Sequence, residues 1–502
     1  MRNNLALAFL ATALIAAAPA TPKPEPTGTY PPDAVTSHTI TLGGKAYAYS
    51  ARAGTIALEN EKGETTARMF YTAFTANSAD PRTRPVTFLY NGGPGSSTIW
   101  LRMGSFGPVR VAVGDAAPTP NAPFNLLDNQ YSLLDRTDLV FVDAPGTGFS
   151  RILGTGKPAD FYGVDPDVKA FAQFVTRYLS EFGRWNSPKF LFGESYGTPR
   201  SAMLVNALQR QGVGINGVVL LSSVLDFSLD WSINFNPTSI GGNDWAFPLY
   251  LPTEAAASWY HHMLPGPQTT LSTLLPQVED FAMHEYLRAL AQGAKLSPSV
   301  YDDVVSKLHQ YTGLSEQYIR QSNLRVPYSR YQTELLRESG VMTGRLDARY
   351  TSVNLDRISD SADFDPTDAA MDAAFVASGN YYVRQVLGYQ TTLIYRPIQG
   401  LFREWEWKHN GNVPVNTAQD LASAMAFNPN LKIFSANGYY DFATPFWATV
   451  YTLNHLMLPP SLQKNISYGF YEAGHMVYVH PQALSQFHDD LETWYGQVLN
   501  PH

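Results

Sequence analysis

Short runs of apolar residues, each ending in a turn that contains glycine, constrain the fold of this chain most strongly. Five such runs lie at residues 86–90, 139–142, 189–192, 218–221 and 431–435. A fully apolar run of this length is typical of a strand buried on both faces, as in a parallel sheet covered by helices. Helical periodicity fills intervals between the runs, at residues 168–182 and at 201–211. The alternation predicts α/β architecture with right-handed crossovers.

Two further segments set the expected domain boundaries. Residues 38–74 alternate between apolar and polar positions, with turn signals at 43–44 and 61–63, which predicts antiparallel strands. The strand rhythm stops between about 230 and 406, where the pattern is largely helical and rich in aromatic residues. We therefore predict a core formed by residues 38–229 and 407–502, with a helical cap over 230–406 that covers the carboxyl edge of the sheet.

The first 20 residues have the pattern of a secretory signal. Arg2 precedes an apolar run at residues 5–17, and small residues at 18 and 20 suit signal peptidase. A membrane anchor is the alternative, but the run is shorter than the ~20 apolar residues that cross a bilayer. Residues 21–37 are expected to form a flexible leader. This pattern predicts a secreted or periplasmic bacterial protein, without disulfides because the chain has no cysteine.

Composition and short motifs argue against several classes of partner. The formal net charge is -8 and no basic cluster is present, which disfavours nucleic acid and anionic membrane surfaces. A G-x-G-x-x-G sequence at 212–217 precedes an apolar run, whereas a dinucleotide site needs it to follow one. His284 and the pair at 261–262 lack further ligands at metal spacing. No metal or cofactor is expected, nor stable membrane insertion after signal cleavage.

A G-x-S-x-G sequence occupies residues 193–197 and places Ser195 at its centre. It directly follows the apolar run at 189–192 and precedes a helical pattern. Its glycines allow a strand to turn sharply into a helix while the serine is held strained and exposed. An ordinary tight turn would fit the motif alone, but its place between strand and helix indicates a catalytic nucleophile.

A nucleophilic serine needs a base and an acid that orients the base, and α/β-hydrolases place them in the chain order Ser, Asp or Glu, His. Asp441 follows the run at 431–435, and His475 lies in a later loop that we place after a strand. Alternatively, Asp441 is a helix cap and His475 an ordinary loop histidine. Their order favours a triad. It predicts an α/β-hydrolase fold with a central, mostly parallel sheet flanked by helices.

Residues 91–97 read Asn-Gly-Gly-Pro-Gly-Ser-Ser and again directly follow an expected strand. Glycine lets backbone N–H groups approach a ligand closely, as an oxyanion hole requires. An ordinary loop is the alternative reading. We favour the oxyanion loop because the triad otherwise lacks one.

These motifs together resemble the serine carboxypeptidase family of the α/β-hydrolase superfamily. The resemblance rests on the blocks at 91–95, 129–150, 193–196 and 474–476 and on the Asp441 loop, which occur in family order. It implies that Ser195, Asp441 and His475 form the triad. It also implies that the backbone N–H groups of Gly93 and Tyr196 form the oxyanion hole.

The resemblance further implies that the side chains of Asn91 and Glu194 bind the terminal carboxylate of the substrate. A glutamate can hydrogen-bond a carboxylate only if one of the two is protonated, so the family generally favours acid pH. The chain has Ser105 where a second glutamate is usual, and Leu89 and Ser96 where tryptophan and cysteine are usual. We expect the Ser105 hydroxyl to donate to the substrate at any pH, and Glu194 to have a lower pKa than in a carboxyl pair.

The resulting hypothesis is a serine-type carboxypeptidase that hydrolyses the C-terminal bond of a peptide or protein through an acyl-enzyme. An acyltransferase or esterase is the alternative, because an alcohol can also resolve an acyl-enzyme. A third reading is a non-catalytic binding protein on a hydrolase fold, which the complete triad disfavours. Retention of Asn91 and Glu194 favours the peptidase.

Overall fold

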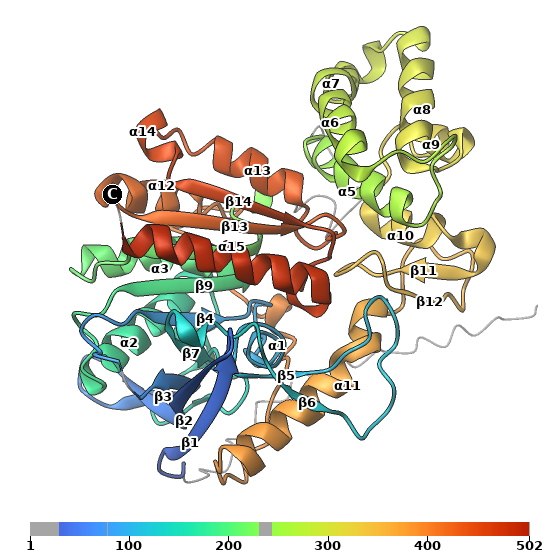
Figure 1. The fold of residues 1–502 in the computed structure, drawn as a ribbon. Coiled ribbons are helices and arrows are strands. Elements are labelled where there is room, and N and C mark those ends of the chain that lie inside the picture. The colour runs from blue at the N-terminus through green and yellow to red at the C-terminus, as the bar shows by residue number, and fades with distance from the viewer. Residues whose placement is uncertain (1–29, 78, 230–242, 501–502) are drawn as a thin grey trace, which may run out of the picture.

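A sheet of ten strands forms the centre of the protein in the computed structural model, which describes residues 30–77, 79–229 and 243–500 (Figure 1). The strand order is β1-β2-β3-β7-β4-β9-β10-β13-β14, and β8 pairs with β3. The strands are β1 (Ala34–Leu42), β2 (Lys45–Glu59), β3 (Thr65–Ala76), β4 (Val86–Tyr90), β7 (Asp138–Val142), β8 (Arg151–Ile152), β9 (Lys189–Ser195), β10 (Gly217–Ser223), β13 (Lys432–Gly438) and β14 (Ile466–Tyr471).

The six strands from β7 to β14 in this order run parallel, whereas β1, β2, β3 and β7 pair antiparallel. All five predicted apolar runs lie in the parallel part, which confirms those strands. The central strand β9 passes through a sharp turn into helix α3 (Gly197–Arg210). A mostly parallel sheet, flanked by helices and with a sharp strand-to-helix turn near its centre, is the α/β-hydrolase fold, so the predicted fold class is confirmed.

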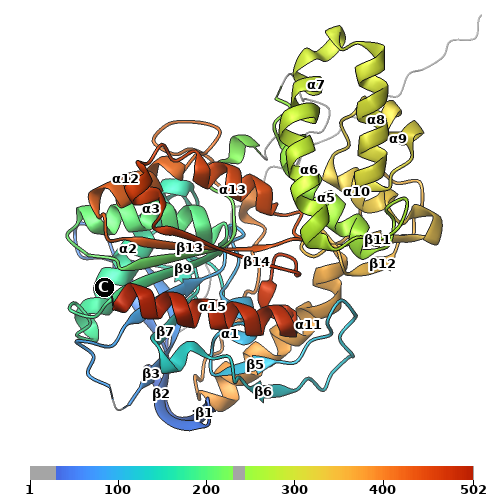
Figure 2. The ribbon, with the colours of Figure 1, turned by 45° about the horizontal axis from the view of Figure 1, so that its top comes forward.

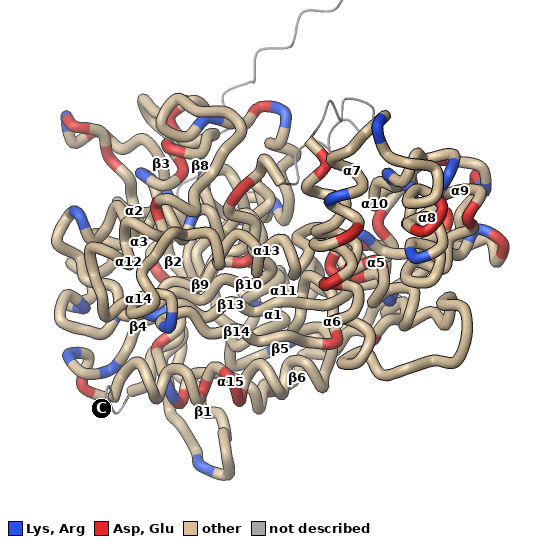
Figure 3. Tube along the Cα trace, turned by 90° about the horizontal axis from the view of Figure 1, so that it is seen from above, with Lys and Arg blue, Asp and Glu red and all other residues tan. Residues whose placement is uncertain are grey.

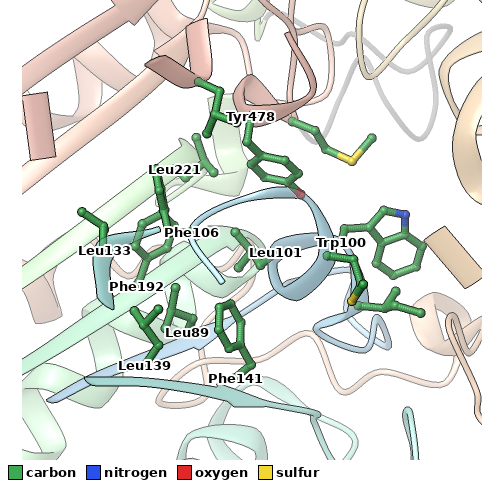
Figure 4. Close-up of a cluster of buried hydrophobic side chains, with 14 of the residues drawn as sticks. Leu89, Trp100, Leu101, Phe106, Leu133, Leu139, Phe141, Phe192, Leu221 and Tyr478 are labelled. Carbon is green, nitrogen blue, oxygen red and sulfur yellow. The ribbon is translucent and has the colours of Figure 1, made fainter. Parts of the chain in front are cut away.

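Helices cover both faces of the sheet and bury alternate residues of its strands. One face carries α1 (Ile99–Gly104), α11 (Pro366–Tyr381) and α15 (Pro481–Leu499), as Figure 2 shows for α15. The other face carries α2 (Val164–Glu181), α3, α12 (Ala418–Phe427) and α13 (Phe446–Asn454). Accordingly, Phe192 packs in the first cluster and Leu191 in the second. Figure 4 shows Phe192 and Leu221 packed with Leu89 and Phe141 near α1.

A separate helical body with its own apolar cluster stands beside the sheet (Figure 1). Tyr440 and Phe442, which follow β13 closely, belong to this cluster, so the body lies at the carboxyl end of the sheet. Its helices are α5 (Ala246–Tyr260), α6 (Leu271–Phe281), α7 (Leu287–Gln292), α8 (Pro298–Thr312), α9 (Glu316–Gln321) and α10 (Tyr328–Glu334). The remaining strands and α-helices of the described residues are β5 (Val109–Val111), β6 (Leu126–Asp128), β11 (Val341–Thr343), β12 (Thr351–Val353) and α14 (Pro460–Gln463).

Two predicted boundaries are wrong. The cap predicted over 230–406 ends too late, because Phe375, Tyr382 and Tyr395 are buried in the same cluster as α1 and α15. The chain from α11 onward therefore belongs to the core. The leader predicted over 21–37 also ends too late, because residues 34–37 pair with residues 50–53 in the β1–β2 ladder.

The described residues carry both signs of charge on the core and on the helical body, as Figure 3 shows. No helix in the described ranges combines the length and apolarity needed to cross a bilayer. The predicted signal at residues 1–20 lies outside the described residues.

Candidate active site

Ser195 stands at the end of β9, in the turn that leads into α3. Its φ of 59° is in the left-handed region, which a residue with a side chain adopts only at a cost. The turn is tight because a Cβ on Gly193 would lie 2.0 Å from the carbonyl oxygen of Gly197. Glu194 and Tyr196 on either side are buried, whereas Ser195 is partly exposed. The glycines thus let the chain present the serine alone at the surface of the turn.

Asp441 and His475 follow the neighbouring strands β13 and β14 and are joined by a hydrogen bond. The distance between His475 Nδ1 and Asp441 Oδ2 is 2.8 Å, and both residues are buried. Asp441 also accepts hydrogen bonds from the backbone N–H groups of Ala443 and Thr444, at 2.7 and 3.1 Å. The Thr444 hydroxyl donates to Asp441 Oδ2 at 2.6 Å. These donors hold the carboxylate in place against the imidazole.

Electrostatics favour the protonated form of His475. Burial alone would lower the pKa of His475, but the charge of Asp441, its hydrogen bond and the charge of Glu194 outweigh burial and raise it. An imidazole whose cation is stabilised in this way can accept a proton from a nucleophile and hold it until the leaving group needs it.

Strand register brings His475 to the end of β9. Ser195 pairs with Ser223 at the end of β10, and the adjacent Ser222 hydroxyl donates to the carbonyl oxygen of His475 at 2.6 Å. Within the described part of the chain, the Ser195 hydroxyl makes no hydrogen bond to His475. Catalytic hydrogen bonds are often long before substrate binds and shorten in the complex.

The glycine loop after β4 lies against the turn of the nucleophile. A Cβ on Gly92 would lie 2.3 Å from the backbone nitrogen of Tyr196, so only glycine permits this approach. The next residue, Gly93, has a φ of 105°, a conformation that favours glycine. The loop therefore packs the backbone of Gly92 against Tyr196, and the oxyanion hole of Gly93 and Tyr196 stays a prediction.

Glu194, Asn91 and Tyr478 form a buried polar cluster beside Ser195. The Tyr478 hydroxyl donates to Glu194 Oε2 at 2.9 Å, and Asn91 also hydrogen-bonds the Glu194 carboxyl. The Asn91 side chain is fixed at its other end, because the N–H group of Leu101 donates to its Oδ1 at 3.1 Å. In Figure 4, Tyr478 lies beside α1, where Gly104 leaves room for its ring.

Burial raises the pKa of Glu194 from its ordinary value of 4.5 to about 7, against the opposing effects of His475, Tyr478 and Asn91. The carboxyl is therefore protonated in acid and close to half protonated at neutral pH. A protonated carboxyl can donate a hydrogen bond to an incoming carboxylate, which an ionised one cannot.

The hypothesis for Ser105 is wrong. Its hydroxyl donates to the carbonyl oxygen of Leu101 at 2.6 Å, so its single proton is used at the C-terminal end of α1 and is not offered to a substrate. Besides Asn91, Glu194 has a polar partner in Tyr478, which sequence reasoning missed. Tyr478 comes three residues after His475, and that short spacing is the one signal that could have placed it near the site.

Comparison with known proteins finds a family match over the part of the chain that contains Ser195. Residues 48–233 match the model of the serine carboxypeptidase family, a segment that contains Asn91, Glu194 and Ser195 but ends before Asp441 and His475. Serine carboxypeptidase-like 33 of Arabidopsis thaliana is 30% identical over 154 residues, which is 30% of this chain and 30% of that protein.

The pheromone-processing carboxypeptidase KEX1 of Phytophthora infestans is 31% identical over 162 residues, 29% of this chain and 23% of that protein. The match thus spans less than a third of the length of either relative. Among solved structures, a lipase in its open form gives a TM-score of 0.38 at 14% identity, with 89% of this chain and 99% of that chain covered. Proline iminopeptidase of Mycobacterium smegmatis gives a TM-score of 0.34 at 12% identity, with 92% of this chain and 99% of that chain covered. The fold assignment rests on strand order and on the sharp turn between β9 and α3.

Proposed function

We propose that this protein is a serine-type carboxypeptidase that removes residues from the C-terminus of peptides or proteins. Ser195 attacks the last peptide carbonyl, and His475 takes its proton while Asp441 orients the imidazole. The backbone N–H groups of Gly93 and Tyr196 stabilise the negative charge that develops on the carbonyl oxygen.

His475 then gives its proton to the leaving amine, which departs as the C-terminal amino acid, and the peptide stays attached to Ser195 as an ester. Water enters, His475 removes its proton, and attack on the ester releases the shortened peptide. Asp441 is bonded to His475 in the structure, and this bond supports the assignment of the base.

The buried, protonatable Glu194 next to the nucleophile carries the proposal of a carboxypeptidase in particular. Its pKa of about 7 keeps a proton available for a substrate carboxylate in acid, and Asn91 provides an amide beside it. An ester or an acyl donor without a free carboxylate would gain nothing from this carboxyl. Asn91 and Glu194 both lie within residues 48–233, which match the model of the serine carboxypeptidase family, and this match supports the proposal.

Digestion of matched peptides tests the proposal. A peptide with a free C-terminus should shorten by single residues from that end when followed by mass spectrometry, and its C-terminally amidated copy should be cut far more slowly. Ser195→Ala, purified in the same way, should release nothing. Equal cleavage of both peptides, or shortening from the N-terminus, would contradict a carboxypeptidase, whereas hydrolysis of simple esters alone would favour the esterase alternative.

We also propose that the protein is a bacterial protein exported through residues 1–20. The signal itself is tested by the N-terminus of the exported chain, as set out below.

A further inference from the structure

One fully buried ion pair lies directly behind the candidate oxyanion hole. Arg200 and Asp167 are both fully buried, with Arg200 on α3 and Asp167 on α2. Arg200 Nε donates to Asp167 Oδ2 at 2.6 Å, and Nη2 donates to Oδ1 at 3.2 Å. A buried ion pair of this kind is weak evidence for stability, because desolvation can cancel the attraction between the charges. Its position therefore calls for another explanation.

The third nitrogen of the Arg200 guanidinium reaches across to the glycine loop. Nη1 donates to the carbonyl oxygen of Asn91 at 2.8 Å, two residues before Gly93. A guanidinium can bind a carboxylate with two nitrogens and a carbonyl with the third, which a lysine ammonium cannot do with the same geometry. Arg200 therefore ties the backbone of the glycine loop to the pair of helices α2 and α3.

The same guanidinium also packs on the residue that provides the second oxyanion donor. Arg200 lies one helical turn after Tyr196, and its backbone N–H group donates to the Tyr196 carbonyl oxygen at 3.3 Å. Its guanidinium lies 5.4 Å from the centre of the Tyr196 ring and 4.3 Å from that of Phe171. The far end of Tyr196 is held by Trp405, whose Nε1 donates to the Tyr196 hydroxyl at 3.0 Å.

We propose that Arg200, oriented by Asp167, is a positioning residue that fixes the Gly93 loop relative to Tyr196 and so sets the spacing of the two oxyanion donors. The inference rests on the proposed function, since it assigns Arg200 a role in the same reaction. Oxyanion donors act on charge that is present only in the transition state, so a change in their spacing should lower kcat more than it changes KM. The Asn91 side chain has its own anchor at Leu101 N–H, which keeps substrate binding largely unaffected.

The chain offers a matched control in a second buried arginine. Arg184 Nη1 donates to Asp138 Oδ2 at 2.6 Å, and Nη2 donates to the Arg84 carbonyl oxygen at 2.9 Å. This pair is also buried, but Asp138 begins β7 at the opposite end of the sheet from Ser195. Arg184 Nε donates to Ser187 Oγ at 2.7 Å, so Arg184 binds its carboxylate with one nitrogen where Arg200 uses two. Arg184→Lys thus removes a buried guanidinium with carboxylate and carbonyl partners without touching the site.

The experiment compares Arg200→Lys with Arg184→Lys in melting temperature, kcat, KM and inhibition by a peptide boronate, which mimics the tetrahedral intermediate. We expect similar losses of melting temperature. In Arg200→Lys alone, we expect kcat and the affinity for the boronate to fall about 30- to 100-fold, while KM stays within about threefold of the wild-type value. The reason is that removal of one oxyanion donor lowers kcat by roughly 10²–10³-fold. If Arg200→Lys does not fold, the uncharged pair Arg200→Met with Asp167→Leu leaves no lone buried charge and should show the same kinetic loss.

Equal kcat values in Arg200→Lys and Arg184→Lys would overturn the inference, as would a loss confined to KM. A wild-type protein that shortens no peptide would instead refute the proposed function, and this inference with it. If the wild type shortens peptides and Arg200→Lys keeps the kcat of the wild type, the positioning role of Arg200 is refuted and the proposed function stands.

Discussion

Raising the pH through neutrality should weaken the binding of any ligand that presents a free C-terminal carboxylate. The reason is that Glu194 loses the proton with which it donates to that carboxylate. Burial places the pKa of Glu194 at about 7. Its other partner, Tyr478, has a pKa raised well above its ordinary value by burial and by Glu194, so it stays protonated and does not contribute to the change.

The size of the effect follows from this pKa and from Coulomb's law. One unit above the pKa, about a tenth of Glu194 is protonated, so the inhibition constant of a product peptide should be about tenfold higher at pH 8 than at pH 5. The ionised form contributes little, because two like charges 4 Å apart repel by about 4 kcal/mol at an effective dielectric of 20. Above pH 8 the inhibition constant should therefore keep rising about tenfold per pH unit, until the affinity for the peptide has fallen by roughly three orders of magnitude.

Calorimetric binding of a product peptide to Ser195→Ala between about pH 5 and pH 9 measures this directly. In the same background, Glu194→Gln provides a permanent amide donor and should make binding nearly independent of pH. A C-terminally amidated copy of the peptide should bind weakly at every pH. A flat profile for the protein with Glu194 intact, or an equally steep one for Glu194→Gln, would refute the role assigned to this carboxyl.

The same raised pKa has a consequence for stability. The pKa of Glu194 is 4.5 in the unfolded chain and about 7 in the folded protein. Between pH 4.5 and about pH 7, Glu194 is therefore protonated in the folded protein and ionised in the unfolded chain, so the folded state binds more protons. Stability therefore falls as pH rises through this window and stops falling above it. At 1.36 kcal/mol per unit of pKa, the loss is roughly 3 kcal/mol. Glu194→Gln should not lose this stability, as urea unfolding at pH 5 and pH 8 would show.

Two substitutions and one measurement on the unchanged protein test other parts of the account. Asp441→Asn should lower kcat by about four orders of magnitude with the fold retained, because His475 loses the partner that fixes its tautomer, and a loss under tenfold in steady-state kinetics would contradict this. Trp405→Phe leaves the buried Tyr196 hydroxyl without its donor and should cost about 1–3 kcal/mol in urea unfolding, whereas an unchanged midpoint would show that the bond contributes nothing. N-terminal sequencing of the exported protein should begin at about Thr21, and a chain that begins at Met1 would exclude cleavage.

The parallel strands could be predicted because burial on both faces leaves continuous apolar runs, as at residues 86–90 and 189–192. Strand β14 (Ile466–Tyr471) has no such run, because it ends the sheet and half of its residues are only partly buried. Helix α11 could not be assigned to the core, since its position depends on contacts with α1 that are distant in sequence.

Tight turns could be predicted where a motif constrains the backbone, as at Ser195 and Gly93, which both have positive φ. Roles that depend on side-chain direction could not be predicted. Ser105 occupies the expected position in the sequence, but its hydroxyl turns back to Leu101. Likewise, the Arg200 bond to Asn91 joins residues 109 positions apart, and nothing in the local sequence indicates it.

Covalent labelling by a fluorophosphonate tests the central claim most directly, because the reagent reacts with a serine that is activated by a base and faces an oxyanion hole. Mass spectrometry of the digested protein should find the label on Ser195 alone, labelling should be lost in Ser195→Ala, and it should be strongly slowed in His475→Ala. A wild-type protein that stays unlabelled, or that carries the label on a different serine, would contradict the account.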